Sequence, residues 1–445
     1  METPPLETQP GKKLTRTVWI ALLLLGFSGQ LAWAVENQFF NTFLYNEITP
    51  DPQAISWMVA ITAFVSTTTA ILMGNLSDRT RSKWGRRRPY LVIGYVIWGI
   101  FTGLFSSSAL FSSVSAGVFM AILLDSIMTF FGATANDAAF NAYVTDVTNK
   151  ENRGRVSGIL EIMTWISILF VYGGSGLIIE AVGYPVFFYA VGGIVLLVGL
   201  ITAPMLKEPP VTEPVRGTYW QQLARTFSKE NLKVNRDVFL ILASSAIFNL
   251  ATNVFFPYLV VYLQHHLKLP TLQYSILVGV AILVGAIILA YPIGLLVDKW
   301  GRFPVAVLAI VLEAVGLFVF SLTKNFIPAL FGGLLWLTPM AAYTIAILAW
   351  TKDLFPEENR GQFAGYYVLF KVAFAMIPGP LLGGWLAAKY GQAIVIDGNA
   401  GTVPPPLIFQ VAAGITLLAL IPLFFMRRKQ KNEARQLAEE QASQI

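Results

Sequence analysis

The sequence contains no cysteine, and charged residues make up only 13% of its 445 positions. Without cysteine the chain can form neither a disulfide scaffold nor a thiolate metal site, and it has no thiol nucleophile. Soluble domains carry about 25% charged residues, so the composition argues against an ordinary soluble enzyme and against a disordered chain. Hydrophobic residues occupy 55% of the positions instead, which is typical of a chain that crosses a membrane many times.

Motifs for catalysis and for nucleotide binding are also missing. The pattern G-x-x-x-x-G-K-[ST], with which P-loop ATPases bind phosphate, does not occur. The only two histidines, His265 and His266, adjoin Lys268, and we interpret them as solvated residues at a helix end. We therefore expect no enzymatic activity, no ATP-driven pumping by this chain, no cofactor and no bound metal ion.

Long apolar stretches recur along the chain, each close to the roughly 20 residues with which a helix crosses a bilayer. They predict twelve transmembrane helices, at residues 17–45, 51–76, 89–110, 114–146, 155–180, 184–206, 237–264, 270–297, 303–323, 326–351, 362–388 and 403–426. The expected fold class is an all-α polytopic membrane protein. Residues 1–16 are polar and lack a small-residue cleavage site, which argues against a processed signal peptide.

The distribution of basic residues predicts the orientation of these helices. With the N-terminus in the cytoplasm, all but four of the 31 Lys and Arg fall on the cytoplasmic side; Lys268, Lys324 and Lys389 fall outside, and Lys371 lies within a span. This asymmetry follows the positive-inside rule and predicts a multi-pass protein of the cell membrane with both termini in the cytoplasm. The net charge of +6 then reflects topology and contact with anionic lipids, and no nucleic-acid partner is expected.

An internal repeat divides the chain into two halves of six spans. Residues 143–158 recur as residues 350–365, and in both copies an aspartate is followed by the run E-N-R-G. Residues 74–89 have a shorter counterpart at 294–304. The repeat predicts a cytoplasmic tail (1–16), a six-helix bundle (17–206), a cytoplasmic linker (207–236), a second six-helix bundle (237–426) and a second cytoplasmic tail (427–445).

The loop after span 2 reads G-N-L-S-D-R and then G-R-R-R, which resembles the signature of the major facilitator superfamily. Its counterpart after span 8 extends the resemblance to the whole chain and implies two pseudo-symmetric bundles that rock about a central site. We expect the two loop aspartates to cap helix N-termini, and the arginines to form ion pairs that close the cytoplasmic side. Anchoring in lipid headgroups is the alternative. The gate candidates are Gly74, Asp78, Arg79, Gly85, Arg86, Asp146, Arg153, Asp298, Arg302, Asp353 and Arg360.

Further stretches resemble the glycoside–pentoside–hexuronide cation symporters and the related sucrose–proton carriers. The loop at 77–89 has their length, and span 1 carries the Trp33-Ala-Val-Glu36 stretch of animal sucrose-carrier relatives. The run 137–140, Asp-Ala-Ala-Phe, is similar to the Asp-x-x-Phe with which melibiose-type carriers hold sugar, and Lys371 stands where that group also has a lysine. The chain departs from the group at its sodium site, where two aspartates of span 2 are replaced by serine and alanine at positions 66 and 70. We therefore expect coupling to protons rather than to sodium.

Ionisable residues within a membrane span are costly and are functional candidates by default. Six occur in the predicted spans: Glu36, Asp125, Asp137, Glu161, Glu313 and Lys371. Counting about 1.5 Å per residue places Asp137 and Lys371 at similar depth, so the geometry allows a charge pair between them. Our hypothesis is that Asp137 binds sugar hydroxyls and exchanges the proton, with Lys371 tuning its pKa. A permanent structural ion pair is the alternative.

The other four acids have weaker expected roles. Glu161 is expected either to couple protons at the gate or to form a structural pair. Glu36 and Asp125 fall in the outer half of the membrane, where both are expected to be wet, and only its resemblance keeps Glu36 as a coupling candidate. Glu313 is expected to form a local hydrogen bond.

Neutral polar residues form stripes on spans 1 and 7. Gln30, Trp33, Asn37 and Asn41 lie on one helical face, as do Ser245, Asn249 and Asn253. Such amides either bond neighbouring helices or line a cavity that binds hydroxyl groups, with Trp33, Phe256 or Trp336 stacking on a sugar ring. The substrate-binding candidates are Gln30, Trp33, Asn37, Asn136, Asp137, Asn141, Asn249, Asn253 and Trp336.

The sequence thus predicts a monomeric, proton-coupled symporter for a glycoside, with a di- or oligosaccharide as substrate, that works by alternating access. Its expected partners are this small molecule and membrane lipids. A proton-driven exporter of amphipathic compounds is the first alternative. A lipid carrier or a non-transporting sensor on the same fold is the second.

Overall fold

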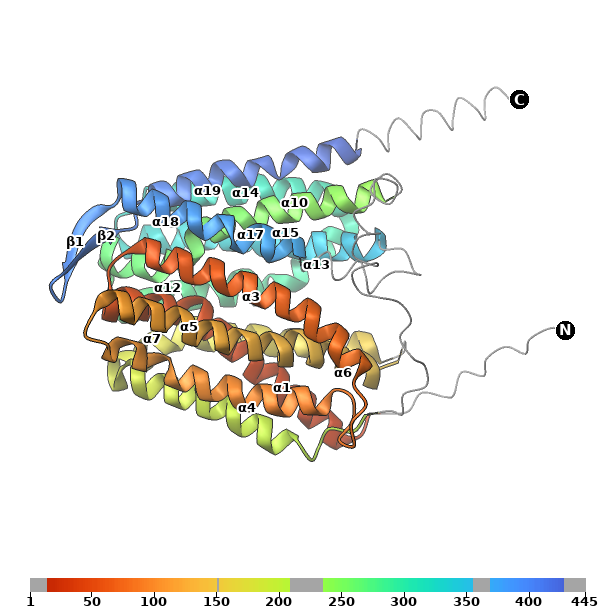
Figure 1. The fold of residues 1–445 in the computed structure, drawn as a ribbon. Coiled ribbons are helices and arrows are strands. Elements are labelled where there is room, and N and C mark those ends of the chain that lie inside the picture. The colour runs from red at the N-terminus through yellow and green to blue at the C-terminus, as the bar shows by residue number, and fades with distance from the viewer. Residues whose placement is uncertain (1–13, 150–151, 209–234, 355–368, 428–445) are drawn as a thin grey trace, which may run out of the picture.

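The computed structural model describes residues 14–149, 152–208, 235–354 and 369–427 (Figure 1). In these ranges 11 helical stretches are long and apolar enough to cross a membrane. One of them, α7 (Arg153–Thr202), bends at Gly183, whose φ of 79° is not helical, and therefore contains two spans. The all-α polytopic fold with twelve spans is confirmed.

The first half, up to residue 208, contains spans 1 to 6. Its elements are α1 (Arg16–Val35), η1 (Glu36–Phe40), α2 (Asn41–Phe43), η2 (Leu44–Ile48), α3 (Pro52–Arg79), α4 (Arg88–Leu104), η3 (Phe105–Leu110), α5 (Val114–Gly132), η4 (Ala133–Phe140), α6 (Asn141–Val147) and α7. Span 1 extends from α1 to η2 and span 4 from α5 to α6, each as one continuous helical stretch.

The second half, from residue 235 on, contains spans 7 to 12. Its elements are α10 (Arg236–Phe255), η5 (Phe256–Tyr258), α11 (Leu259–Val261), η6 (Tyr262–His266), α12 (Thr271–Ala281), η7 (Ile282–Ile288), α13 (Ala290–Trp300), α14 (Arg302–Ser321), α15 (Phe326–Leu354), α17 (Ala373–Met376), α18 (Pro378–Tyr390), β1 (Gln392–Ile396), β2 (Asn399–Val403) and α19 (Leu407–Leu418). Span 12 begins at Leu407, four residues later than predicted.

Local chemistry sets where the helices begin. The Asp51 carboxylate accepts a hydrogen bond from Gln53 N at 2.9 Å, and Pro52 supplies the first helical residue of α3. The Ser113 hydroxyl accepts from Ala116 N at 3.2 Å and caps α5 in the same way. Both caps satisfy N–H groups that have no partner within the helix, which matters most where the helix then enters a medium without water.

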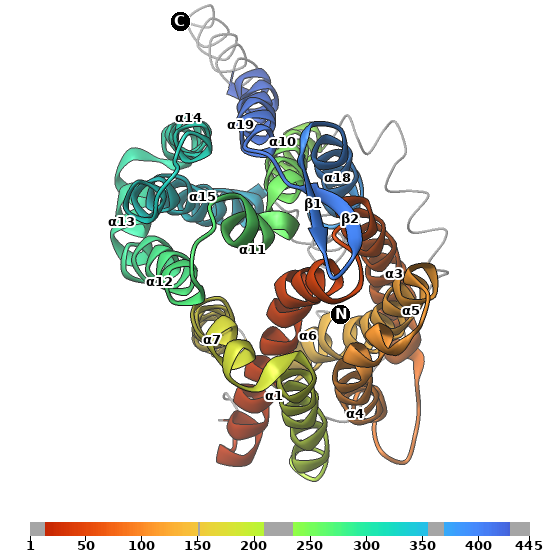
Figure 2. The ribbon, with the colours of Figure 1, turned by 90° about the vertical axis from the view of Figure 1, so that its left-hand side faces the viewer.

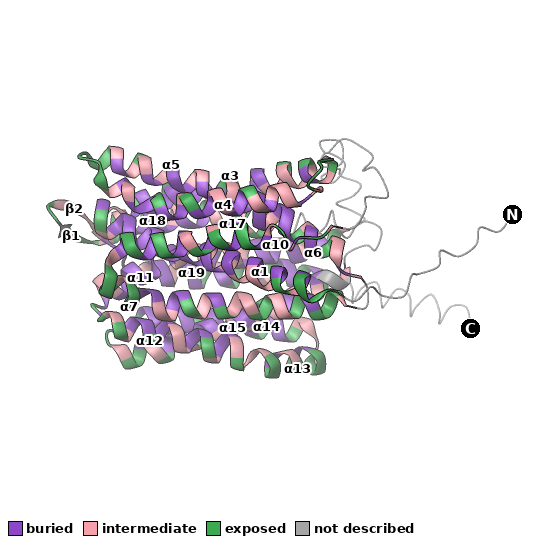
Figure 3. Cartoon of the chain, turned by 90° about the horizontal axis from the view of Figure 1, so that it is seen from below, coloured by how far each residue is buried: buried purple, intermediate pink, exposed green. Residues whose placement is uncertain are grey.

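Exposed residues lie along the outer helices of the bundle (Figure 3), and many of them are large and apolar. Phe64, Phe119 and Phe331 are 62%, 66% and 66% exposed. Soluble proteins rarely expose many such groups together, whereas hydrocarbon chains of a bilayer solvate them well. The surface therefore fits a lipid environment.

Spans 1 and 4 are interrupted by wide π-helical turns, η1 and η4. Glu36 opens η1, and Asp137 lies within η4. A π turn has i→i+5 hydrogen bonds and occurs frequently at functional sites. It also rotates the residues that follow it relative to a regular α-helix.

A β-hairpin, which the sequence analysis did not predict, covers one end of the bundle, here called the hairpin end (Figure 2). β1 and β2 pair antiparallel, with Gln392 opposite Val403. Thr402 N donates to Pro50 O at 3.0 Å, and Tyr45 OH donates to Thr402 O at 2.8 Å. The hairpin of the second half is thus bonded to the loop that joins spans 1 and 2.

Further contacts join the halves at and below the hairpin end. α3 packs against α18, and α7 packs against α12. His265 Nε2 lies 2.8 Å from Asn46 Oδ1, across the boundary between the halves. The interpretation of His265 as a solvated residue is therefore wrong, because its ring is half-buried in this contact.

Candidate functional site

Two neighbouring cavities lie inside the helix bundle and share the span 1 residues Gln30, Trp33 and Asn37. The first, here called the polar cavity, has a volume of about 320 Å³. Besides the shared residues, its polar and charged lining comprises Glu36, Asn41, Thr62, Ser66, Asp125, Thr129, Asp137 and Lys371. Hydrogen-bonding side chains and both signs of charge therefore converge on one space.

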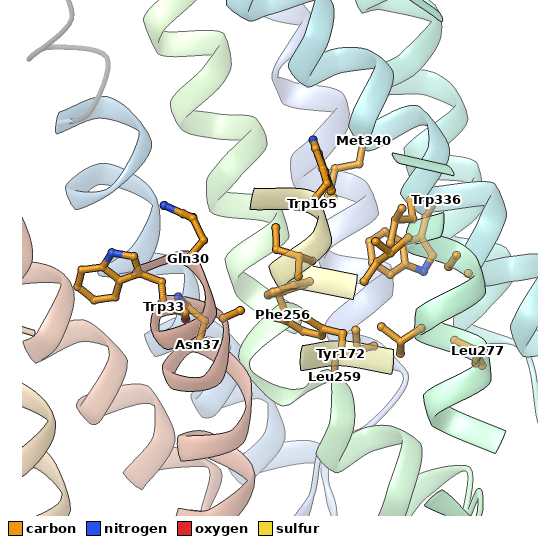
Figure 4. Close-up of a pocket in the computed structure, with 17 residues that line it drawn as sticks. Gln30, Trp33, Asn37, Trp165, Tyr172, Phe256, Leu259, Leu277, Trp336 and Met340 are labelled. Carbon is orange, nitrogen blue, oxygen red and sulfur yellow. Dashed lines mark hydrogen bonds between the residues drawn. The ribbon is translucent and has the colours of Figure 1, made fainter. Parts of the chain in front are cut away.

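The second, here called the aromatic cavity, has a volume of about 250 Å³. Figure 4 shows Trp165 and Tyr172 of α7 and Phe256 of η5 around it. Trp336 and Met340 of α15 complete the wall. Aromatic faces and aliphatic side chains form nearly all of this lining, so it suits an apolar group better than a sugar.

Asp137 and Lys371 line the polar cavity from opposite halves, since η4 belongs to span 4 and Lys371 to span 11. The side chain of Trp33 lies beside the Asp137 carboxyl group. An acid and a base from the two halves thus line one cavity, together with the indole of Trp33. Their interaction stays a prediction.

Glu36 and Asp125 also line the polar cavity, where the sequence analysis expected wet and unremarkable acids. Glu36 is only 9% exposed and Asp125 only 2%. Thr129 Oγ1 donates to Glu36 Oε1 at 2.9 Å. The expectation of wetted side chains is wrong, because the helices of spans 1 and 4 cover both acids. Asp125 was noted as an ionisable residue within an apolar span but was not assigned to the site.

The asparagine stripes satisfy their donors within their own helices. Asn37 Nδ2 donates to Trp33 O at 2.7 Å, and Asn41 Nδ2 donates to Asn37 O at 2.8 Å. In span 7, Asn249 Nδ2 donates to Ser245 O at 2.7 Å, and Asn253 Nδ2 donates to Asn249 O at 2.8 Å. Neither asparagine of span 7 lines either of the two cavities. Only the span 1 stripe therefore faces the candidate site.

The two asparagines that flank Asp137 lie away from the cavities. Asn136 Nδ2 donates to Tyr95 OH at 2.8 Å, and Tyr95 OH donates to Leu25 O at 2.8 Å. These two hydrogen bonds link span 4 to spans 3 and 1. They correspond to the alternative in which the amides bond neighbouring helices. Asn141 is exposed, and its Nδ2 donates to Asp137 O at 3.0 Å.

Glu161 and Glu313 lie outside both cavities as well. Glu161 is exposed. Glu313 is fully buried in α14, and neither of its carboxyl oxygens has a hydrogen-bond partner among the residues that the structure describes. The local hydrogen bond expected for Glu313 is thus not found there.

At the end opposite the hairpin, arginines bind the aspartates of neighbouring helices. Arg86 Nη2 lies 2.7 Å from Asp146 Oδ2, and Arg87 Nε lies 3.2 Å from the same oxygen. Arg87 also pairs with Asp78 and donates to Ser77 Oγ at 2.5 Å. These contacts join α3, α4 and α6, which all belong to the first half. They brace that half, and Arg87, which is only 3% exposed, was missed as a candidate.

Glu208 caps the N-terminus of α4. Its carboxylate accepts hydrogen bonds from the backbone N–H groups of Arg86, Arg87 and Arg88, at 2.6, 2.7 and 2.6 Å. A helix N-terminus attracts an anion in this way. We expected Asp78 to act as a cap, but its carboxylate binds Arg87 instead.

The remaining gate candidates make fewer described contacts. Gly85 has a φ of 104°, which explains the glycine in this turn, whereas an added Cβ at Gly74 would meet nothing within 4 Å. Arg153 Nε donates to Thr148 Oγ1 at 3.3 Å. Asp298 and Arg79 are exposed and Arg302 is half-buried. The side chain of Asp353 and all of Arg360 lie outside the described residues.

We expect Arg87→Ala to destabilise the protein by about 2–3 kcal/mol, because two carboxylates lose a buried partner while retaining some access to water. Thermal unfolding in detergent measures the effect. Arg81→Ala serves as the control, since Arg81 is an exposed arginine of the same loop. Equal losses of thermal stability in the two variants would contradict a bracing role for Arg87.

No group of three or more His, Asp or Glu side chains among the described residues is placed to hold a metal ion. A comparison with curated proteins gives no match. Among solved structures, a variant of the nucleoside transporter NupG matches with a TM-score of 0.70 and 14% identity, covering 92% of this chain and 99% of that one. A bacterial homologue of the human lysosomal transporter Spinster, in an inward-facing and occupied conformation, matches with a TM-score of 0.68 and 13% identity. The match covers 92% of this chain and 96% of that one.

A D-xylose–proton symporter also matches, with a TM-score of 0.67, 16% identity and coverages of 92% and 96%. At such identities these likenesses show the fold alone. The model of the Major Facilitator Superfamily matches residues 18–370 and, in a second alignment, 250–444. The chain, with its twelve spans and its cavities inside the bundle, therefore belongs to the major facilitator superfamily of membrane transporters.

Proposed function

We propose that the protein is a proton-coupled symporter for a glycoside, with a di- or oligosaccharide as substrate, that works by alternating access. The observation that carries this proposal is the polar cavity, to which span 1 contributes amides, span 4 a carboxyl group and span 11 an ammonium group. Sugars need many hydrogen bonds, and charged partners make the strongest ones. Gln30, Asn37 and Asp137 supply such groups, and Trp33 offers an aromatic face.

The proposed coupling ion is the proton. Span 2 contributes the neutral groups of Thr62 and Ser66 to the cavity, whereas a hard cation such as sodium prefers anionic oxygens. Asp137 combines a sugar-binding position with a titratable group, and Lys371 faces the same space from the other half. The D-xylose–proton symporter, which has the same fold, supports the proposal that this fold can transport a sugar together with a proton.

The proposed orientation has the termini and the basic loops in the cytoplasm of a cell-membrane protein, which follows the positive-inside rule. Arg86 and Asp146 then brace the first half at the cytoplasmic surface. Their proposed gate partners in the second half, around Asp353 and Arg360, belong to the repeated motif. The protein is proposed to act as a monomer.

A second candidate function is the proton-driven export of an amphipathic compound. The aromatic cavity favours it, because Trp165, Tyr172, Phe256 and Trp336 surround an apolar space next to the acids of the polar cavity. A lipid carrier would use the same walls. The sugar symporter is preferred because the charged residues from the two halves meet in the polar cavity.

Proton flux in reconstituted vesicles tests the proposal. Adding a panel of disaccharides to the outside should alkalinise the medium if protons enter with a sugar, and protein-free vesicles should show no change. If no disaccharide alkalinises the medium while a proton gradient drives export of an amphipathic dye, the protein is an exporter. The sugar symporter would then be refuted.

A further inference from the structure

The carboxyl groups of Glu36 and Asp125 meet inside the first half. Glu36 opens the π turn of span 1, and Asp125 lies on α5 of span 4. The two carboxyl groups lie within hydrogen-bonding range of each other. Thr129 lies one helical turn after Asp125 and donates to the other oxygen of Glu36. Two acids that are remote in sequence thus form one buried pair.

One carboxyl oxygen of each acid has no donor in the part of the chain that the structure describes. Within the described residues, neither Glu36 Oε2 nor Asp125 Oδ1 has a hydrogen-bond partner from the protein. Glu36 is 9% exposed and Asp125 is 2% exposed, so little water reaches them from outside the cavity. Two carboxylates at this range in such surroundings cannot both be ionised. A proton between them turns the repulsion into an O–H···O hydrogen bond.

The charged groups that face the pair come from both halves. Asp137 of η4 acts on Glu36 electrostatically and lines the same cavity. Lys371 of span 11 lines it from the second half. α3 of span 2 contributes the neutral Thr62 and Ser66. The pair therefore has a third acid beside it and one cation, and that cation belongs to the half that moves relative to it during alternating access.

We propose that Glu36 and Asp125 form a two-carboxyl proton-binding site that holds one proton beside the sugar site, in addition to Asp137. This inference rests on the proposed function for its role in coupling. Since both acids belong to the first half, rocking of the halves leaves the pair intact and changes the position of Lys371 relative to it. That change in electric field, together with access from the cavity, determines when the proton enters and when it leaves.

Infrared difference spectroscopy of the purified protein in detergent tests the site without any sugar. Raising the pH should remove the carbonyl stretch of a protonated carboxylic acid from the wild-type spectrum. Glu36→Gln and Asp125→Asn should each remove or shift that band, and Asp137→Asn should retain it. Glu313→Gln is the matched control, because Glu313 is a buried acid of span 9 that has no hydrogen-bond partner among the described residues and lines neither cavity.

Two spectroscopic results would overturn the proposal. One is a wild-type set of titrating carbonyl bands in which neither Glu36→Gln nor Asp125→Asn removes or shifts any band. The other is loss of the band on adding sodium at constant pH, which would make the pair a cation site. Circular dichroism and size-exclusion chromatography of each variant verify that a missing band does not come from misfolding.

Transport then separates this inference from the proposed function. Asp125→Asn should reduce proton-driven accumulation at least tenfold more than it reduces sugar counterflow, which needs no net proton movement. Unchanged accumulation would overturn the coupling role of the pair. If the wild type moves no disaccharide at all while its infrared band behaves as expected, the proposed substrate is refuted and the proton site stands.

Discussion

Gly192→Ala is expected to destabilise the protein by about 3 kcal/mol, while Gly193→Ala, one position further along the same helix, is expected to stabilise it by up to about 1 kcal/mol. Gly192 is where α7 crosses α4. A Cβ added there would lie 2.6 Å from Gly103 N, and one added at Gly99 would lie 2.6 Å from Leu196 N. These neighbours are backbone atoms, so relief requires the two helices to move apart.

The contact between Gly99 and Gly192 matters because lipid offers no hydrophobic drive for helix association. Helices in membranes associate through close packing of small residues instead. Gly193 lies beside this contact, and a Cβ there would meet nothing within 4 Å, so alanine costs nothing there and favours the helix. Thermal unfolding in detergent and the yield of monodisperse protein measure both effects. Equal stability of the two variants would contradict the close crossing of α4 and α7.

Asp137→Asn is expected to abolish proton-driven accumulation of the sugar and to weaken its binding. The amide cannot exchange a proton at physiological pH. It also gives up charge-assisted hydrogen bonds, worth about 2 kcal/mol, which corresponds to roughly thirtyfold weaker affinity. Quenching of tryptophan fluorescence measures sugar binding, since Trp33 lies beside Asp137, and uptake along an imposed pH gradient measures coupling.

Asp397→Asn is the matched control for this substitution. Asp397 is exposed in the turn of the hairpin, with a φ of 49° that asparagine also tolerates. Its replacement should leave both binding and accumulation unchanged. Full retention of proton-driven accumulation by Asp137→Asn would refute the coupling role of this carboxyl group, even if binding became weaker.

Much of the fold could be predicted because the bilayer acts on each segment separately. Each span needs its own apolar length and must satisfy its own backbone hydrogen bonds. The predicted stretch 51–76 corresponds to α3 (Pro52–Arg79), and 303–323 corresponds to α14 (Arg302–Ser321). The β-hairpin was not predicted, because its strands lie outside the membrane spans, where no such length rule applies.

The candidate site was predicted where depth or spacing along one helix sufficed, as for the polar stripe of span 1. Asp137 and Lys371 line one cavity, as their similar depth indicated. Asn136, next to Asp137 in sequence, faces Tyr95 and not the cavity. Successive residues of a helix do not share a face, so proximity to Asp137 in the sequence did not place Asn136 in the site.

By itself the sequence determined the twelve spans, the basic loops and the two-fold repeat, since each depends on local composition or on similarity along the chain. Only the tertiary structure decided which buried groups meet. Glu36 and Asp125 are separated by spans 2 and 3 in the chain and are brought together by the packing of span 1 against span 4. Glu208 reaches the start of α4 from the far end of α7. Such contacts depend on the rotation and register of packed helices, which a list of apolar and charged positions does not contain.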